Sequence, residues 1–438
     1  MRYILILLLA AVMNLSAGQF VKSYSDIGVE EYRLNSGLKV FFKKNTLDKG
    51  EVFVRIFSKG GYAQEESLRE KVSAYVSFLA LFESGFGLAS SPDQVSKILY
   101  DNSTELSLYV LPSSKGIEAK IPTHHFDQLV EFIAGAFNHP KIKKTAFSHV
   151  IDSINESVDD LSEKNKYRVL EKMYEVQFKG THFSSDMPGH AIDEADLSVA
   201  QDYVNKSFAE DEQFTIVVVG DINPIKAIES LEKHLPMREH KEKPFAVDVE
   251  KGFAKESMTC SMKGNRSKDA VSSVIYSLKL QPDGKELALF ENSLRVIEKR
   301  LDAKLARVVG KKGIRVSFEF PYYPEASLSW VQIKFNAQPH QKQYVVAAIQ
   351  KEMKDLIENG PSEDEFKQMV SAANNEGAYL KNDNYFWLSV LSDYALWGWD
   401  LNEASFRMEA DASMTPKAMQ EFLKKSVAVN TAVNMFLD

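Results

Sequence analysis

The sequence predicts an α+β protein made of two similar domains, each a mostly antiparallel sheet covered by helices. The chain has 438 residues, 44% of them hydrophobic, which is enough for two cores of about 200 residues each. Each half runs strands, a helix, a hairpin, more helices and a closing strand, which is the order of a duplicated unit. The charged, proline-flanked stretch 234–244 lies between them, so we expect domains at 25–238 and 245–438.

Two hairpin turns and a buried strand mark the first half. Asn35-Ser36-Gly37 and residues 112–116 each separate two strand-like segments, as hairpin turns do. Residues 51–57 alternate between apolar and polar positions, and 214–220 are apolar almost throughout, which is typical of a buried strand. We expect helices at 68–82, 91–100, 124–137, 143–163, 167–177, 197–208 and 225–235.

A long helix dominates the second half. Large apolar residues recur every three or four positions from 287 to 305, which places them on one helix face. Strands are expected at 257–263 and 271–280, and a strand pair at 314–335 that is interrupted by residues 321–324. The remaining elements are expected to be helices at 344–358, 364–379, 385–396 and 416–425 and a closing strand at 431–436.

The N-terminus has the pattern of a secretory signal peptide. Arg2 precedes an apolar run over residues 4–12, and small residues follow at 16–18. The run is too short to span a bilayer, and no later segment is long and apolar enough to span one. We therefore expect residues 1–18 to be a signal peptide and the chain to be exported, to a periplasm or to the medium. The alternative is a buried N-terminal helix.

Charge and cysteine content argue against several function classes. The net charge is −8, and the lysines are scattered among acids, so the basic stripe that a nucleic-acid partner needs is missing. The single cysteine, Cys260, cannot form an intramolecular disulfide, and no histidine near it in sequence points to a nucleophile, which favours a buried structural thiol. The chain has no G-x-S-x-G motif and no phosphate-binding glycine loop.

Four segments in order resemble the insulinase superfamily, which includes mitochondrial processing peptidase. They are LNSGLKVFFKKN (34–45), EVFVRIFSKGG (51–61), FTIVVVGDINPIKAIESLEKHL (214–235) and the stretch 359–391. The resemblance runs from about Glu31 to the C-terminus, and it is greatest to the zinc-free C-terminal half of the long bacterial periplasmic members. It implies two peptidase-like α/β-sandwich domains of the processing-peptidase type.

The resemblance also implies where zinc would be bound, and the required residues are missing there. The family places His-x-x-Glu-His on the first helix after the second strand, with the glutamate as general base. Aligning the family's glycine with Gly85 puts Val76, Leu79 and Ala80 at the three motif positions. These side chains have no lone pair for zinc, and Glu83 alone is a poor site. We therefore expect no catalytic residues, no metal ligands and no cofactor.

Other metal-binding arrangements are weaker. None of the nine histidines forms H-x-x-E-H or H-x-x-x-H. His124 and His125 are adjacent and would point about 100° apart on a helix. His190 with Glu194 is the best remaining pair. Glu156 loosely matches the family's third ligand, but without the histidines a surface role is expected.

In the second half the family carries an arginine and, seven residues later, a tyrosine that contact the substrate. Arg307 matches the arginine, so it is our candidate substrate-binding residue, with an ordinary helix-end arginine as the equal alternative. Ile314 replaces the tyrosine and cannot donate a hydrogen bond to an oxyanion. Tyr322 and Tyr323 do not fit the motif and are expected to shape a turn.

Three functions are compatible with these observations. The first is a non-catalytic subunit that pairs with a zinc-bearing subunit of the same family, or with itself, around a peptide-processing chamber. The second is a protein that binds an extended peptide without a peptidase partner. The third is an active zinc peptidase with unrecognised ligands.

Overall fold

The computed structural model describes residues 18–87, 89–138, 140–162, 172, 175–176, 188–208, 214–235, 256–262, 272–279, 284–319, 329–408 and 414–437. The expected signal peptide up to residue 17, most of the helix expected at 167–177, most of the expected linker and the turn at 321–324 lie outside these ranges. The chain divides into two compact units. Unit 1 comprises Met1–Ser153, Ile192–Phe245 and Leu380–Leu396, and unit 2 comprises Ile154–Ala191, Ala246–Tyr379 and Trp397–Asp438. The domain boundaries expected from the sequence stay a prediction.

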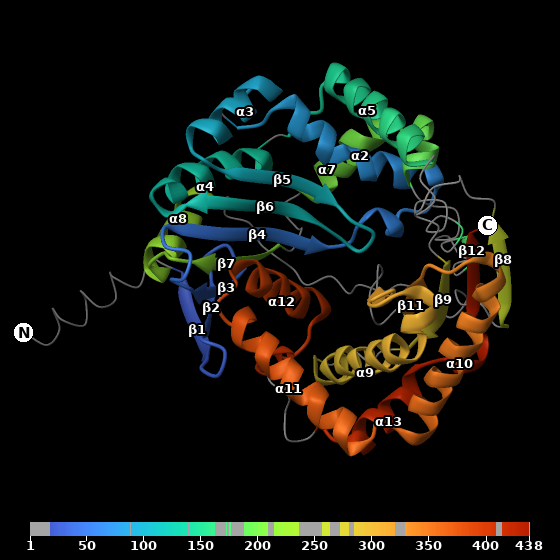
Figure 1. The fold of residues 1–438 in the computed structure, drawn as a ribbon. Coiled ribbons are helices and arrows are strands. Elements are labelled where there is room, and N and C mark those ends of the chain that lie inside the picture. Colours follow the sequence, from blue (N-terminus) through green and yellow to red (C-terminus); the bar gives the residue numbers. More distant parts are fainter. Residues whose placement is uncertain are drawn as a thin grey trace, which may run out of the picture. The chain divides into compact units, whose positions relative to one another are not determined.

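Unit 1 is built on a mixed sheet of seven strands among the described residues (Figure 1). Its strands are β1 (Gln19–Tyr24), β2 (Val29–Arg33), β3 (Lys39–Lys44), β4 (Glu51–Lys59), β5 (Glu105–Val110), β6 (Ser114–Pro122) and β7 (Thr215–Gly220). Their order is β1-β2-β3-β7-β4-β6-β5, and all neighbours are antiparallel except β3 and β7. The predicted α+β class with mostly antiparallel strand pairs is therefore confirmed for this unit.

One face of this sheet forms the main core of unit 1. Alternation along the paired strands places Phe42, Val54, Ala119 and Val218 on the same face, and each is at most 2% exposed. Among the described residues, the α-helices of unit 1 are α2 (Leu68–Ser84), α3 (Pro92–Asp101), α4 (Phe126–Ala134), the first part of α5 (Lys144–Ser162), α7 (Leu197–Ser207), α8 (Pro224–His234) and most of α12 (Asn384–Trp397). Of these, α2 packs on β5 and α7, and α4 packs on β6 and α8.

The late helix α12 belongs to unit 1, where it is seated against β3. The Lys43 ammonium lies 4.0 Å from the centre of the Trp387 ring, and the Asn45 amide donates to the carbonyl oxygen of Asn382 over 2.8 Å. Lys43 also donates to the carbonyl oxygen of Ile27. Burial lowers the pKa of Lys43 to about 8, because the ammonium is largely removed from water.

Unit 2 has a second mixed sheet, with five strands among the described residues. These are β8 (Met258–Met262), β9 (Ser272–Leu278), β10 (Ile314–Glu319), β11 (Ser329–Phe335) and β12 (Val433–Leu437). Their order is β10-β11-β9-β12-β8, and all neighbours are antiparallel except β12 and β8. The predicted class is thus confirmed here as well.

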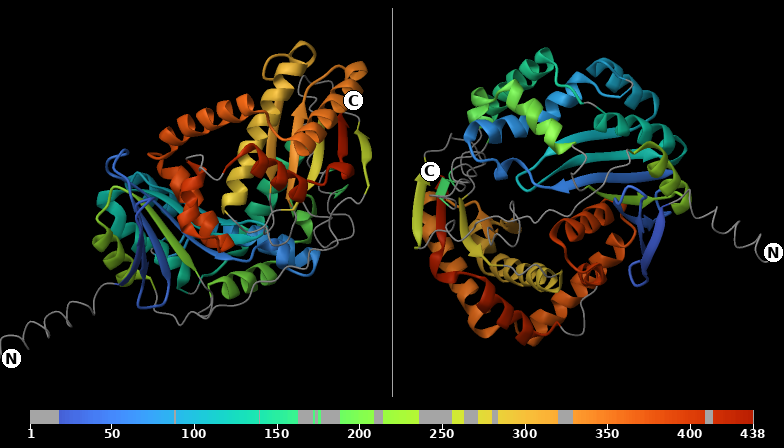
Figure 2. Two further views of the ribbon diagram at one scale, coloured as in Figure 1. Left: turned by 90° about the horizontal axis from the view of Figure 1, so that it is seen from below. Right: turned by 180° about the vertical axis from the view of Figure 1, so that it is seen from behind.

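Three helices of unit 2 pack together on its sheet, as Figures 1 and 2 show: α9 (Gly284–Val309), α10 (Lys342–Asn359) and α13 (Pro416–Ser426). The predicted apolar face of α9 is buried, with Ile297, Leu301 and Leu305 at most 1% exposed. The next helix, α11 (Glu363–Leu380), follows α10 after a short turn. Within the described ranges, no helix combines the length and the apolarity needed to cross a bilayer.

Candidate functional site

Helix α2 is the helix on which the resemblance places the zinc motif, and its ends are well defined. Ser67 accepts from the backbone N–H of Glu70 while Glu70 accepts from that of Ser67, a reciprocal cap that starts the helix. The helix ends at Gly85, whose φ of 76° favours glycine. A Cβ atom at Gly85 would lie 2.7 Å from the carbonyl oxygen of Ala89. This glycine is the one used to align the motif, so local structure supports its place at the helix end.

The three motif positions do not form a metal site. Val76 and Ala80 are fully buried in the core, and Leu79 is 38% exposed. None of the three side chains can donate an electron pair to zinc, so the residues present do not fit the metal. Over the whole described part of the chain, no group of three or more His, Cys, Asp or Glu side chains is arranged to hold a metal ion.

A single line of α2 side chains is accessible to solvent between residues 71 and 84. Tyr75, Leu79, Phe82 and Glu83 are exposed or half-buried, and the other side chains of this stretch are buried. Their spacing of i, i+4, i+7 and i+8 places them on one face of the helix. We call these four residues the open stripe. It is apolar or aromatic for three residues and acidic at its C-terminal end.

Glu83, at the acidic end, has a partner that the sequence did not predict. The Nδ1 atom of His149 lies 3.8 Å from a carboxylate oxygen of Glu83. Helix α5 is joined to the end of α2 by the backbone N–H of Lys143, which donates to the Ser84 hydroxyl over 2.8 Å. Because 66 residues separate Glu83 and His149, no local pattern could have revealed the pair. One imidazole and one carboxylate supply fewer ligands than a zinc site needs. Glu156, further along α5, is exposed.

Strand β5 forms one edge of the unit 1 sheet, and no described strand pairs with its outer side. The Leu111 N–H donates to the carbonyl oxygen of Ser114 over 2.7 Å at the turn that joins β5 to β6. Because antiparallel strands alternate, the backbone groups of Leu106, Leu108 and Val110 then point away from β6. Among the described residues, these N–H and C=O groups have no hydrogen-bond partner. We call them the open edge.

The open stripe and the open edge lie close together in unit 1. Helix α2 packs against β5, and its cover keeps Leu108 and Val110 at most 5% exposed. Tyr62 connects the two, because its N–H donates to the carbonyl oxygen of Leu111 over 3.1 Å and its ring centre lies 5.7 Å from that of Tyr75. Burial raises the pKa of Tyr75, so its hydroxyl stays neutral.

The other face of the sheet beside the open edge is polar. Glu105 and Ser107 of β5 are exposed on this face. On the neighbouring strands, Arg55 donates to the carboxylate of Glu118 over 2.8 Å. Lys120 pairs with Glu51 at 3.1 Å. A strand added at the open edge would therefore have an apolar surface on one side and a polar surface on the other.

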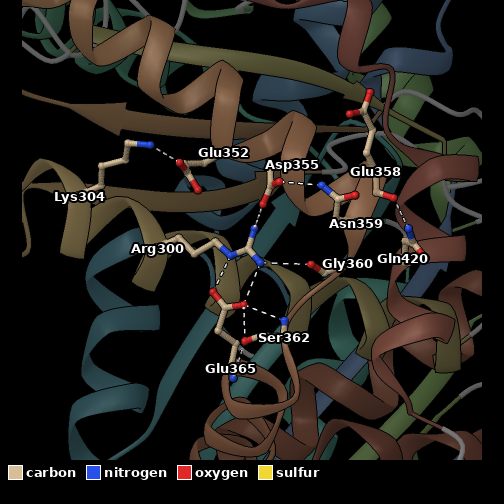
Figure 3. A network of polar contacts seen from close by, with 10 residues as sticks. All are labelled: Arg300, Lys304, Glu352, Asp355, Glu358, Asn359, Gly360, Ser362, Glu365 and Gln420. Atoms are coloured by element: carbon tan, nitrogen blue, oxygen red, sulfur yellow. Dashed lines mark hydrogen bonds and ion pairs between the residues drawn. The ribbon is translucent and has the colours of Figure 1, made fainter.

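In unit 2, Arg307 is the predicted substrate-binding residue. It is exposed in the last turn of α9, on the same side of the helix as Arg300 and Lys304. Figure 3 shows that these two neighbours are engaged by carboxylates of α10 and α11. Arg307 forms no ion pair or hydrogen bond within the described part of the chain. Ile314, at the tyrosine position, is fully buried.

The Arg300 guanidinium joins α9 to the turn between α10 and α11. Its Nε donates to Glu365 over 2.6 Å, its Nη1 to Asp355 over 3.0 Å, and its Nη2 to the carbonyl oxygen of Gly360 over 3.2 Å. The hydrogen bonds from Arg300 and from the Ser362 backbone and hydroxyl lower the pKa of Glu365 to about 2. This cluster is structural, which distinguishes Arg300 from the unengaged Arg307.

The other candidate residues show no site. Cys260 is half-buried in β8, and burial raises the pKa of its thiol, which fits a structural cysteine better than a nucleophile. The rings of His124 and His125 lie 4.1 Å apart, and His125 contacts Gln128. The side chain of His190 and residues 322 and 323 lie outside what the structure describes.

Comparison with known proteins shows what this chain is similar to. Residues 195–373 match the model of the peptidase M16 inactive domain. The chain is similar to the periplasmic protease PqqL from Escherichia coli, with 14% identity and a TM-score of 0.76 over 96% of this chain and 46% of PqqL. It is also similar to a peptidase M16 inactive domain from Pseudomonas fluorescens (12% identity, TM-score 0.75, 93% and 97% covered). A protease from Helicobacter pylori gives a TM-score of 0.77 at 12% identity, with 94% and 99% covered.

These identities are low, so the solved structures establish the fold alone. No curated protein sequence matches the chain significantly. The chain spans about half the length of PqqL. Together with the family model, the fold confirms the resemblance to the insulinase superfamily, the M16 peptidases, that the sequence predicted. In particular, the match to an inactive domain supports the likeness to the C-terminal half of the long members.

Proposed function

We propose that this chain is a non-catalytic subunit of an M16-type peptidase, which pairs with a zinc-bearing subunit and helps to hold extended peptides. The proposal rests on α2, which has the helix cap and terminal glycine but lacks zinc-ligating side chains at the motif positions. The helix keeps its cap, its terminal glycine and its place beside β5, while Val76, Leu79 and Ala80 occupy the positions that zinc chemistry needs. The scaffold is thus kept without the ligands.

The open edge supports the peptide-holding part of this function. An extended peptide can add to an unpaired strand and gain main-chain hydrogen bonds without regard to its sequence. Three residues of β5 offer both of their backbone groups for this purpose. In unit 2, the side chain of Arg307 is exposed and unengaged within the described residues, so it is available for a cationic contact with a substrate.

The same open edge supports a second function, a peptide-binding protein that has no peptidase partner. Both functions fit an exported protein, in agreement with the N-terminal signal pattern and with the periplasmic location stated for PqqL. They differ in the partner. The first predicts a companion chain that carries His-x-x-Glu-His, and the second predicts a chain that is isolated alone or as a self-dimer.

Native mass spectrometry after purification from the natural source separates these functions. A stable complex with a chain that carries the zinc motif is the expected result, with cleavage activity that a chelator abolishes. A lone chain or self-dimer that binds peptides would favour the second function. Stoichiometric zinc in the isolated chain, together with cleavage of peptides, would refute both functions and establish an active peptidase with other ligands.

A further inference from the structure

The open stripe on α2 lies close to the open edge of β5, and three of its four side chains are apolar or aromatic. Leu79 is 38% exposed at the position of the family's general base, although an exposed leucine gains nothing from contact with water. Tyr75 and Phe82 are half-buried on either side of it. A row of aromatic and aliphatic groups along an unpaired strand provides a surface for the side chains of an added strand.

The two features match in length. From Tyr75 to Glu83 the helix rises by about 12 Å at 1.5 Å per residue. From Leu106 to Val110 the strand extends by about 13 Å at 3.3 Å per residue. A peptide that pairs with the whole open edge therefore runs past the stripe over about five residues. Tyr62 bridges Leu111 and Tyr75, so the C-terminal end of β5 lies at the Tyr75 end of the stripe.

The pleat of a strand decides which side chains meet the stripe. Successive side chains of an added strand point to opposite faces of the sheet. One set would face α2 and the open stripe, and the other set would face Glu105 and Ser107 of β5. The first surface is apolar and the second is polar, so each favours a different class of side chain.

We propose that the open stripe makes this chain selective for extended peptides whose residues alternate between apolar and polar. The apolar side chains pack on Tyr75, Leu79 and Phe82, and the polar ones lie beside Glu105 and Ser107. This inference rests on the proposed peptide-holding function, because it names the class of peptide held at the same edge. Where the zinc site of relatives would be, this chain would have an apolar recognition surface.

Anisotropy titration of the full chain with three labelled heptapeptides tests the inference. The first peptide alternates serine with leucine, the second has asparagine in place of each leucine, and the third is the first with alternate backbone amides N-methylated. We expect the first to bind about tenfold more tightly than the second, since apolar burial at two or three positions is lost. N-methylation should abolish binding because it removes the donors that pair with the strand.

Variants then assign the selectivity to the stripe. Leu79→Ser should weaken the leucine peptide about fivefold and leave the asparagine peptide unchanged, and Leu79→Met should retain the binding of the native chain. Leu47→Ser is the matched control, because Leu47 is also an exposed leucine of unit 1 (65% exposed) but does not belong to the open stripe. Circular dichroism melting of all variants verifies that each is folded.

The outcomes distinguish apolar selectivity from the proposed peptide-holding function on which it rests. Weaker binding of the leucine peptide by the Leu79→Ser variant alone supports the inference. Equal affinity of the native chain and the Leu79→Ser variant, with N-methylation still disruptive, overturns the apolar selectivity and leaves strand addition in place. Failure of every peptide to bind would overturn both the selectivity and the peptide-holding function.

Discussion

Replacing Arg300 by methionine should destabilise unit 2 far more than the loss of a surface ion pair. Arg300 is only 13% exposed in its side chain and donates to Glu365, Asp355 and the carbonyl oxygen of Gly360 (Figure 3). Hydrogen bonds to charged groups contribute about 1.5–3 kcal/mol each when well shielded. Partial exposure of the carboxylates reduces this contribution, and methionine keeps some of the packing, so we expect a net loss of about 2–4 kcal/mol.

Lys304→Met provides the matched control on the same helix. Lys304 pairs with Glu352, but its side chain is 37% exposed, so its loss should cost about 0.5 kcal/mol. Urea unfolding followed by circular dichroism measures both variants. Hydrogen exchange of the amides at 360–366 then shows whether the turn between α10 and α11 has loosened. An Arg300→Met variant as stable as Lys304→Met would refute the view that this cluster holds the helices together.

The pH dependence of the stability of the native chain and of Arg300→Met provides a second check. The pKa of Glu365 is about 2 in the folded chain, below its ordinary value of 4.5. A depressed carboxyl pKa stabilises the fold above the unfolded pKa, and this stabilisation is lost as pH falls through the folded pKa. The stability difference between the native chain and Arg300→Met should therefore be constant near pH 7 and shrink between about pH 4.5 and pH 2.

Three further predictions concern unit 1 and the proposed substrate contact. Lys43 has a folded pKa of about 8 against 10.5 for the free group, so the unfolded chain binds more protons between these values. The stability of the native chain relative to Lys43→Met should therefore rise by about 1–2 kcal/mol from pH 8 to 10.5, and a flat difference in chemical denaturation would contradict the buried ammonium. A fragment ending at Phe245 lacks α12, whose Trp387, Leu388 and Tyr394 are at most 1% exposed in the whole chain. Without α12 the fragment should lose about 5–8 kcal/mol of the free energy that apolar burial contributes to folding. It should therefore bind a hydrophobic dye, and adding a synthetic peptide of residues 380–397 should displace the dye. Arg307→Ala should leave the melting temperature within about 1 °C and weaken peptide binding about threefold to tenfold, whereas unchanged affinity in the titration would make Arg307 an ordinary helix-end residue.

The sequence alone determined the local features of this protein. The position of α2 follows from its cap and its apolar pattern, and the absence of histidine from that helix is visible without coordinates. The apolar spacing from 287 to 305 predicted the buried face of α9, which is confirmed. These features could be predicted because they depend on neighbours within one or two turns. Strand β1 was missed, because five of its six residues are exposed and it lacks the alternating pattern of a half-buried strand.

Only the tertiary structure decided which distant residues meet. A helix was expected at 385–396, where α12 lies, but its apolar residues are on all sides. No single face could therefore show that it packs in unit 1 beside Lys43 and not with its sequence neighbours. The pair of Glu83 with His149 and the engagement of Arg300 but not Arg307 likewise depend on long-range packing. The order of strands left β5 at an edge, and α2, which carries the exposed Leu79, packs on that strand. Contacts between residues far apart in the chain leave no periodic signal in it, so the apolar surface beside an unpaired strand became visible only in three dimensions.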